Sequence, residues 1–281
     1  SLLFEDRRRL NRLTMSRDEA LAHYRFLQEV PGLRFSAQLL ATRGERLALG
    51  RTRIDGSVAG GGGALEGEVL DLAELDADGC IVANLLFDLE DEDAAYAELD
   101  ARFETGEGAE RSAQTGFLRS FRAALVQRDW DAIAASLAED FVGSDHRLVG
   151  WGTLRGVAFV DAFRSMAALA PDVRMRWDHL RTARGAMLAE AVWIGTREGG
   201  PFESPFVFTS EFDASGRLLR CDFFDPHRIG RALARFAELT APATTPQRFA
   251  NAATEIAEPL IAAVVENDWP RYEALFAETL R

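Results

Sequence analysis

Hydrophobic and polar positions along this chain follow two periods. Between Val173 and Leu180 apolar and polar side chains alternate residue by residue, which is the pattern of a strand with one buried face. Further strands are predicted at 186–196, 202–212 and 217–224, with a hairpin turn at 213–216. Helical spacing of apolar residues predicts helices at 116–126, 131–139, 158–168 and 229–239.

The same succession of elements is predicted in the N-terminal part of the chain. Helices are expected at 17–29 and 91–103, and strands near 34–42, 46–54, 64–75 and 81–87. Helices followed by a run of antiparallel strands are typical of the α+β class. We therefore expect two cone-shaped units, each with about three helices packed on a curved antiparallel meander sheet.

Short motifs recur at a nearly constant spacing. The sequence VQRDW at 126–130 matches VENDW at 265–269, and Asp145 matches Asp6, both 139 positions apart. LDADG at 75–79 matches FDASG at 212–216, 137 positions apart. Recurring motifs in a constant order indicate two copies of one structural unit.

The first copy lacks its opening helices, and helices of that kind occur instead after position 247. We predict an intact unit at 111–242 and a split unit made of 1–110 and 243–281. The split unit closes within its own chain or exchanges segments with another molecule. A third alternative is that the chain is an excerpt of a longer tandem array.

Composition excludes several classes of partner. The 281 residues carry a net charge of −13, which disfavours binding to nucleic acid and to anionic membrane surfaces. No apolar run approaches the roughly 20 residues that span a bilayer. The two cysteines have no partner at metal-ligand spacing, so we expect no metal and no cofactor. Reduced thiols predict a cytoplasmic protein, with a disulfide left open.

Several motifs of the intact unit resemble the SnoaL-like branch of the nuclear-transport-factor-2-like superfamily. They are Asp129-Trp130, 137–141, 145–147, 212–217 and 223–225. The repeat is also similar to units at the ends of large actinobacterial regulators. The resemblance implies a sheet that wraps its helices into a cone around an apolar pocket.

The resemblance also implies where a general base would lie. In ketosteroid isomerases of this superfamily, an acidic residue just after the second helix abstracts a proton next to a carbonyl, and Asp145 and Asp6 fall at that position. Such a base needs a pKa raised by burial. The oxyanion donors of those isomerases are missing, because Phe121 and Leu260 replace a tyrosine and Phe208 replaces a protonated acid. In the split copy, Asp71 stands at the latter position.

Further candidates surround Asp145. His146 is a second catalytic candidate, and Arg147 would bind an acidic group of a ligand. A purely structural ion pair of Asp145 with Arg147 is the alternative interpretation. His179 is expected at the pocket or its rim. The predicted pocket wall is aromatic and consists of Phe121, Trp151, Trp177, Trp193, Phe208 and Phe224.

Three functions compete. The first is a non-catalytic small-molecule-binding or assembly module with a regulatory role. The second is a cofactor-free isomerase, cyclase or hydratase that uses a pocket aspartate as general base on a small hydrophobic substrate. The third is a structural dimerisation domain. In each case we expect a homodimer or an intramolecular pseudo-dimer of the two units. The second function requires a closed, mostly apolar cavity with Asp145 or Asp6 at its wall.

Overall fold

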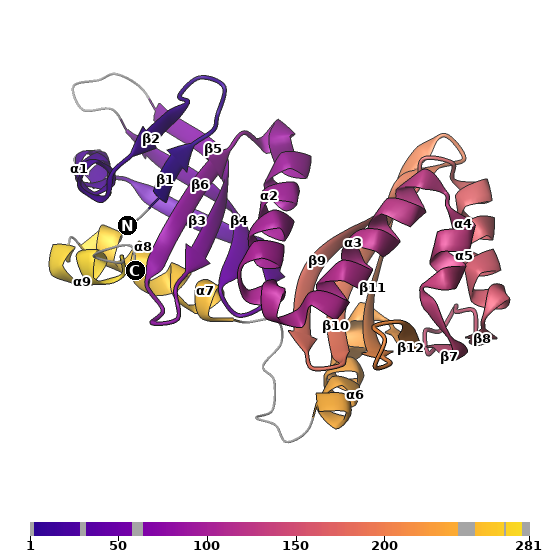
Figure 1. The fold of residues 1–281 in the computed structure, drawn as a ribbon. Helices are drawn as coiled ribbons and strands as arrows, with labels where there is room; N and C mark the ends of the chain where they lie inside the picture. The colour runs from indigo at the N-terminus through magenta and orange to yellow at the C-terminus, as the bar shows by residue number, and fades with distance from the viewer. Residues whose placement is uncertain (1–2, 29–31, 58–63, 241–250, 267, 277–281) are drawn as a thin grey trace. The chain divides into compact units, whose positions relative to one another are not determined.

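The computed structural model describes residues 3–28, 32–57, 64–240, 251–266 and 268–276 (Figure 1). The chain divides into two compact units. Unit 1 comprises Ser1–Phe103 and Ala250–Arg281, and unit 2 comprises Glu104–Phe249. The predicted boundary at 242–243 lies outside the described residues. The other boundary lies between Phe103 and Glu104, before the predicted position 110. Gly108 accordingly belongs to unit 2, where its carbonyl oxygen accepts a hydrogen bond from Thr115 Oγ1 at 3.4 Å.

Unit 2 is built on a six-stranded sheet of order β9-β10-β11-β12-β7-β8. The strands are β7 (Leu137–Asp145), β8 (Thr153–Arg155), β9 (Arg174–Ala183), β10 (Ala186–Arg197), β11 (Gly200–Phe212) and β12 (Leu218–Phe224). The helices are α3 (Ser112–Gln127), α4 (Trp130–Ala135), α5 (Val157–Leu169) and α6 (Ile229–Thr240). Strands β9 to β12 form the expected antiparallel meander, and β7 adds to it in parallel with β12.

The predicted helix at 131–139 is wrong at its C-terminal end. Asp129 caps α4 by accepting a hydrogen bond from Ala132 N at 2.9 Å, but the helix ends at Ala135. Leu218 N donates to Ser136 O at 2.9 Å, and Leu137 pairs with Leu218. Tertiary pairing therefore makes 137–139 a strand, although the apolar spacing alone suits a helix.

Unit 1 has the same topology, with strand order β2-β1-β6-β5-β4-β3. The strands are β1 (Leu3–Asp6), β2 (Leu13–Met15), β3 (Arg34–Arg43), β4 (Leu47–Ser57), β5 (Ala64–Leu75) and β6 (Ile81–Phe87). The helices are α1 (Arg17–Gln28), α2 (Glu92–Thr105), α7 (Ala252–Glu255), α8 (Ala257–Glu266) and α9 (Trp269–Ala274). Strands β1, β2, β7 and β8 were not predicted from the sequence.

Both units also share one register at their parallel edge. In unit 2, β7 runs along β12 so that Leu137 pairs with Leu218 and Val142 with Arg220. In unit 1, Phe276 bridges Ile81 in parallel and Leu3 pairs with Ala83. Strand β1 and Phe276 come from opposite ends of the sequence, yet both lie along β6. Together they take the place that the single strand β7 has along β12.

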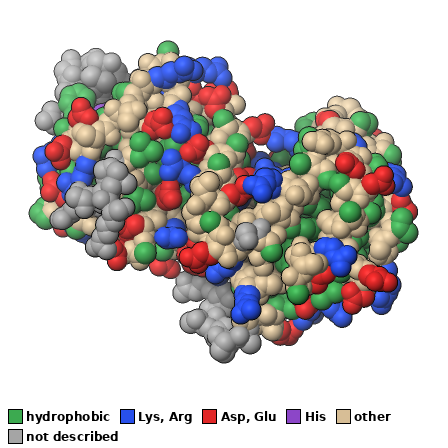
Figure 2. Space-filling model, in the orientation of Figure 1, with side chains coloured by type: hydrophobic (Ala, Val, Ile, Leu, Met, Phe, Trp, Pro, Cys, Tyr) green, Lys and Arg blue, Asp and Glu red, His purple; other side chains and the backbone are tan. Residues whose placement is uncertain are grey.

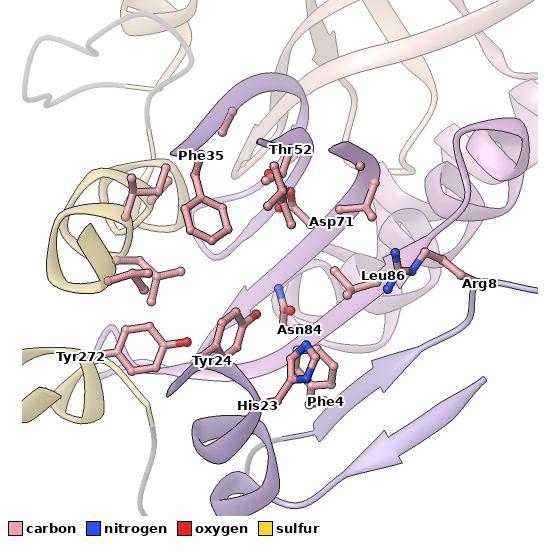
Figure 3. A pocket seen from close by; sticks show the side chains of 18 of the residues that line it. Phe4, Arg8, His23, Tyr24, Phe35, Thr52, Asp71, Asn84, Leu86 and Tyr272 are labelled. Atoms are coloured by element: carbon pink, nitrogen blue, oxygen red, sulfur yellow. Dashed lines mark hydrogen bonds between the residues drawn. The ribbon is translucent and has the colours of Figure 1, made fainter. Parts of the chain in front are cut away.

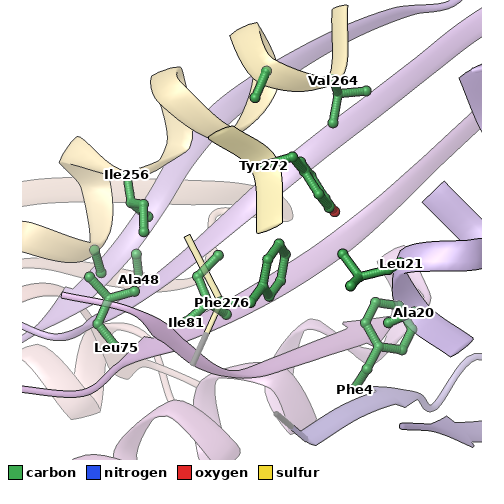
Figure 4. Close-up of a cluster of buried hydrophobic side chains, with 12 residues drawn as sticks. Phe4, Ala20, Leu21, Ala48, Leu75, Ile81, Ile256, Val264, Tyr272 and Phe276 are labelled. Atoms are coloured by element: carbon green, nitrogen blue, oxygen red, sulfur yellow. The ribbon is translucent and has the colours of Figure 1, made fainter. Parts of the chain in front are cut away.

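The core of unit 1 joins those two segments (Figure 4). Phe4 comes from β1, Ile81 from β6, and Tyr272 and Phe276 from the C-terminal part of the chain, and all four are at most 4% exposed. Ile256 and Val264 belong to the same cluster. Burial of this much apolar surface is the main free energy that holds α7–α9 on the sheet.

Asn251 fixes the start of these helices. Its side chain accepts a hydrogen bond from Thr254 N at 2.9 Å, and Thr254 Oγ1 accepts one from Asn251 N at 2.9 Å, which forms a capping box. The Nδ2 group donates to Gly44 O at 2.9 Å and Leu47 O at 3.2 Å, in and after the β3–β4 turn. One buried amide therefore caps α7 and attaches it to the sheet.

Charged side chains of both signs are interspersed on the face of the molecule shown in Figure 2. Within the described parts of the chain, no helix combines the length and the apolar character needed to cross a membrane.

Candidate ligand-binding site

A cavity of about 400 Å³ lies in unit 1 between the sheet and helices α1, α8 and α9 (Figure 3). This volume is within the range of natural small-molecule sites, roughly 300–1,000 Å³. Its apolar wall includes Phe4, Phe35, Ile54, Val69, Leu86, Leu260, Ile261 and Val264. Its polar groups are Arg8, His23, Tyr24, Thr52, Glu66, Asp71, Asn84 and Tyr272.

Asp71 is the carboxyl group of the cavity wall. It lies on β5 opposite Gly50 of β4 and Leu86 of β6. A Cβ atom at Gly50 would come within 3.3 Å of Asp71 Oδ1, so the glycine leaves the carboxyl room beside the strand. Thr52 Oγ1 donates a hydrogen bond to Asp71 Oδ2. Among the described residues, Asp71 has no arginine or histidine as an ion-pair partner.

The environment of Asp71 favours its neutral form. The Asp71 side chain is half-buried and borders the cavity. Burial raises the pKa of Asp71, and the hydrogen bond from Thr52 offsets only part of that rise. A carboxyl group with a raised pKa in a cavity is the feature that the sequence analysis expected at other positions.

Hydrogen-bonding groups from three further elements face the same space. Asn84 lies on β6 two residues before Leu86, so its side chain is on the same face of the sheet as that of Asp71. Its Oδ1 atom is buried and accepts no hydrogen bond from any residue the structure describes. Tyr24 of α1 and Tyr272 of α9 pack with ring centroids 5.5 Å apart.

The two tyrosines correct one expectation from the sequence. Burial raises the pKa of both phenols, so both hydroxyls remain protonated donors at neutral pH. Leu260 does line the cavity and cannot donate, as expected. The hydroxyl donors belong instead to Tyr24 of α1 and Tyr272 of α9. The expectation from the sequence was based on one position of another helix.

Asp6 is not the base that the resemblance implied. Its carboxylate is bound by Arg8, with Nε–Oδ1 at 3.0 Å and Nη2–Oδ2 at 2.7 Å, and by Asn11 Nδ2 at 3.3 Å. Burial by itself would raise the pKa of Asp6, but these hydrogen bonds outweigh burial and lower it. The expectation of a raised pKa for Asp6 is therefore wrong. Arg8 borders the cavity, but its guanidinium is already paired with Asp6.

Asp145 of unit 2 has the equivalent geometry. Arg147 donates to it through Nε at 2.9 Å and Nη2 at 2.8 Å, and Trp151 N donates at 3.0 Å. The carboxyl would have a raised pKa from burial alone, yet the bound donors hold its pKa below the ordinary value. The Arg147 guanidinium also lies over the ring of Trp151, 5.6 Å from its centroid. This ion pair matches the purely structural interpretation of Asp145 and Arg147. The Nε and Nη2 groups of Arg147 are both bound to Asp145 and are not available as a pair of donors for a ligand.

The other polar candidates of unit 2 lie away from its interior. His146 Nε2 is 2.9 Å from Asp222 Oδ1, and its ring stacks on Phe224 at 5.0 Å. Phe224 belongs to a cluster under α6, on the opposite face of β12 from Phe223. His179 pairs with Glu190 across a β-bulge that leaves Trp177 facing inward. The structure therefore does not bring His146, His179 and Asp145 together.

Aromatic side chains fill the interior of unit 2. Only about 30 Å³ of space remains there, which is close to the volume of one water molecule. The lining includes four of the predicted pocket residues, Phe121, Trp177, Trp193 and Phe208. These residues are the core of unit 2 and not the wall of an open pocket.

The register of the two sheets explains why one interior is hollow and the other full. Five corresponding inner-face positions carry non-aromatic, smaller residues in unit 1 and aromatic residues in unit 2. In the order unit 1 then unit 2, they are Ala37 and Trp177, Ile54 and Trp193, Val69 and Phe206, Asp71 and Phe208, and Leu86 and Phe223. The larger rings occupy the volume that is open in unit 1.

Neither thiol nor metal chemistry stands out in the described residues. They contain no group of three His, Cys, Asp or Glu residues that could hold a metal ion. Neither Cys80 nor Cys221 takes part in a disulfide within the described part of the chain, and burial raises the pKa of Cys221. A buried thiol with a raised pKa is a poor nucleophile.

Sequence reasoning missed most of the polar groups of the cavity. It noted Asp71 but not Thr52, Asn84, Tyr24 or Tyr272. Thr52 and Asn84 were detectable in principle, since both lie at inward-facing positions of predicted strands. The tyrosines were not, because their convergence depends on how α1 and α9 pack on the sheet.

Comparison with solved structures returned proteins that each match less than half of the chain. An LEH-like epoxide hydrolase from Mycobacterium tuberculosis is 21% identical, covers 46% of this chain and 93% of its own, and has a TM-score of 0.35. An NTF2-like protein of unknown function from Burkholderia pseudomallei is 22% identical, with 46% and 99% coverage and a TM-score of 0.35. A Catenulispora acidiphila protein with a ketosteroid isomerase-like fold is 19% identical, with 46% and 97% coverage and a TM-score of 0.35.

No curated protein sequence matches the chain. Residues 118–221 match a family model described as a SnoaL-like domain. That segment runs from α3 to β12 and includes most of the sheet of unit 2. Residues 118–221 are therefore similar to a SnoaL-like domain, and they lie in a unit with an α+β fold.

Proposed function

We propose that this protein is a non-catalytic small-molecule-binding module with a regulatory role, in which unit 1 binds the ligand and unit 2 is a solid structural unit. The observation that carries the proposal is the contrast between about 400 Å³ of open space in unit 1 and about 30 Å³ in unit 2. An unfilled, mostly apolar cavity reduces stability unless an occupant restores the lost contacts. Selection for binding accounts for its retention.

The experiment is calorimetric titration with 1-adamantanol, a compact neutral probe that fits an apolar cavity of this size. We expect one site per chain, because among the described residues the cavity of unit 1 has about 400 Å³ of space and the interior of unit 2 about 30 Å³. Binding should also raise the melting temperature as the probe concentration increases. No detectable binding, or two equivalent sites per chain, would contradict the proposal.

A second function is favoured by the chemistry of Asp71. A carboxyl group with a raised pKa, in a cavity wall that also includes Tyr24 and Tyr272, has the elements of a general base with phenol donors nearby. Under this alternative the protein is a cofactor-free isomerase, cyclase or hydratase acting on a small hydrophobic substrate. Asp71 would then be the base, in place of Asp6 or Asp145.

Exchange of protons for deuterium separates the two functions. Cyclohexanone in D₂O is followed by NMR for loss of its α-protons with and without protein. A base at Asp71 would accelerate exchange, and Asp71→Asn would abolish the acceleration. Binding without accelerated exchange would support the non-catalytic module. The expected homodimer or intramolecular pseudo-dimer remains a prediction, for which mass in solution is the measurement.

A further inference from the structure

The polar part of the cavity in unit 1 lacks a positive partner. Asp71 accepts a hydrogen bond from the neutral Thr52 and has no ion pair among the described residues. Asn84 Oδ1 is a second buried acceptor without a donor in the described part of the chain. Buried acceptors left unpaired cost free energy, which a donor on a ligand would recover.

The remaining titratable groups around the cavity do not supply that charge. These groups are Arg8, His23, Tyr24, Glu66 and Tyr272. The Arg8 guanidinium is paired with Asp6, with Nη2–Oδ2 at 2.7 Å. Burial lowers the pKa of His23, which favours its neutral imidazole, and Glu66 at the rim is exposed and acidic. The space is therefore suited to a cation.

The apolar wall suits a cation as well. The rings of Phe4, Tyr24, Phe35 and Tyr272 border the cavity, and the faces of such rings attract ammonium groups within about 6 Å. The net charge of −13 on the whole chain raises the local concentration of cations near the protein.

Resting on the proposed ligand-binding function, we propose that the cavity of unit 1 selects a compact hydrophobic amine. Its ammonium group would be bound by the carboxylate of Asp71 and by Asn84 Oδ1, and its hydrocarbon body by the apolar wall. Binding of the ammonium ion requires the carboxylate form of Asp71.

The test compares three probes of one shape and different charge: 1-adamantanamine, 1-adamantanol and adamantane-1-carboxylate. Calorimetric titration at pH 6 should give at least ten-fold tighter binding of the amine than of the alcohol, and weakest binding of the carboxylate. The affinity for the amine, unlike that for the alcohol, should increase with pH as Asp71 ionises.

Two variants locate the preference. Asp71→Asn keeps the shape of the side chain and should make the amine and the alcohol bind equally. Glu66→Gln removes an exposed carboxylate at the rim and should change the preference less than three-fold. Equal effects of the two variants would mean that the overall negative charge of the protein, and not Asp71, selects the cation.

The outcomes separate this inference from the function on which it rests. If the alcohol binds as tightly as the amine to the wild-type chain, the amine inference is overturned and the ligand-binding function stands. If none of the three probes binds, the ligand-binding function fails and the inference with it. Unchanged preference in Asp71→Asn would also overturn the inference.

Discussion

Asp71 of unit 1 and Phe208 of unit 2 occupy the same position on equivalent strands. Asp71 pairs with Leu86 on β6, and Phe208 pairs with Phe223 on β12. Both side chains face the helices of their own unit, one at the wall of a cavity and the other in a packed core. Exchange of one residue class for another at shared positions thus distinguishes a domain with a cavity from one with a packed core.

Filling the cavity of unit 1 should abolish ligand binding. The double variant Val69→Phe and Leu86→Phe introduces the side chains that unit 2 has at the corresponding positions. We expect at least a ten-fold loss of affinity for 1-adamantanol in calorimetric titration, because the rings occupy the volume of the probe. Phe206→Leu in unit 2 is the control and should bind normally. Retained affinity in the double variant would place the site elsewhere.

Asp71→Asn should stabilise the protein increasingly as pH rises. The folded-state pKa of Asp71 is raised by burial, so its stabilising contribution is present below the unfolded pKa and is lost as pH rises through the folded pKa. The neutral amide avoids that loss. Urea unfolding of the wild type and of Asp71→Asn between pH 4 and 8 measures the difference in unfolding free energy. The contributions of Asp6 and Asp145 are the same in both proteins and cancel in this difference. A difference independent of pH would show that Asp71 is not perturbed.

Asp145→Ala should destabilise the fold strongly. Asp145 and Arg147 have side-chain exposures of 2% and 13%, and removing one partner leaves a largely buried charge unpaired. Loss of one member of a buried pair typically costs about 3–5 kcal/mol. The control is Asp161→Ala, which breaks an ion pair with Arg164 whose side chains are 50% and 52% exposed, and which should cost at most about 1 kcal/mol. Similar unfolding free energies for the two variants would refute the prediction.

The same ion pairs predict the acid limit of stability. The folded-state pKa values of Asp6 and Asp145 are lowered, so the stability they contribute is present above the unfolded pKa and is lost as pH falls through the folded pKa. Acid unfolding followed by circular dichroism should therefore begin below the ordinary aspartate pKa of about 3.9. In Asp145→Asn this part of the pH dependence should be weaker.

Asn251→Ala should loosen helices α7–α9. The substitution removes the cap of α7 and two buried hydrogen bonds to Gly44 O and Leu47 O. Loss of a cap costs about 0.5–2 kcal/mol, and each unsatisfied buried group adds about 1–3 kcal/mol. Hydrogen exchange of α8 amides is the measurement. Asn251→Asp retains the cap acceptor without the Nδ2 donors, so its exchange rates should lie between those of Asn251→Ala and the wild type.

Much of the fold was predictable from periodicity. The predicted strands at 64–75 and 81–87 match β5 and β6, because alternation of apolar and polar residues reports a half-buried strand directly. The short strand β7 was predicted as helix at its start, since Leu137 is a strand residue only by pairing with Leu218. Because this part of β7 is fixed by pairing with a distant segment, residues 137–139 carry no alternation of apolar and polar side chains that would identify a strand.

The candidate site was less predictable than the fold. The resemblance indicated Asp145 and Asp6, but arginines two residues later bind both carboxylates and lower their pKa values. An Asp-x-Arg pattern is visible in the sequence, yet whether it forms an ion pair or a base depends on backbone geometry. Trp177 and Trp193, expected as pocket wall, lie inside unit 2 and fill the space themselves.

The sequence by itself determined the α+β class and the alternation of strands, because these depend on the order and period of side chains along the chain. Tertiary structure alone decided which unit is hollow. That outcome depends on side-chain volumes summed across four strands and on helices distant in the numbering, such as α9, which places Tyr272 opposite Asp71 on the cavity wall. A cavity is the volume that no side chain fills, and it exists only once all of its walls are in place.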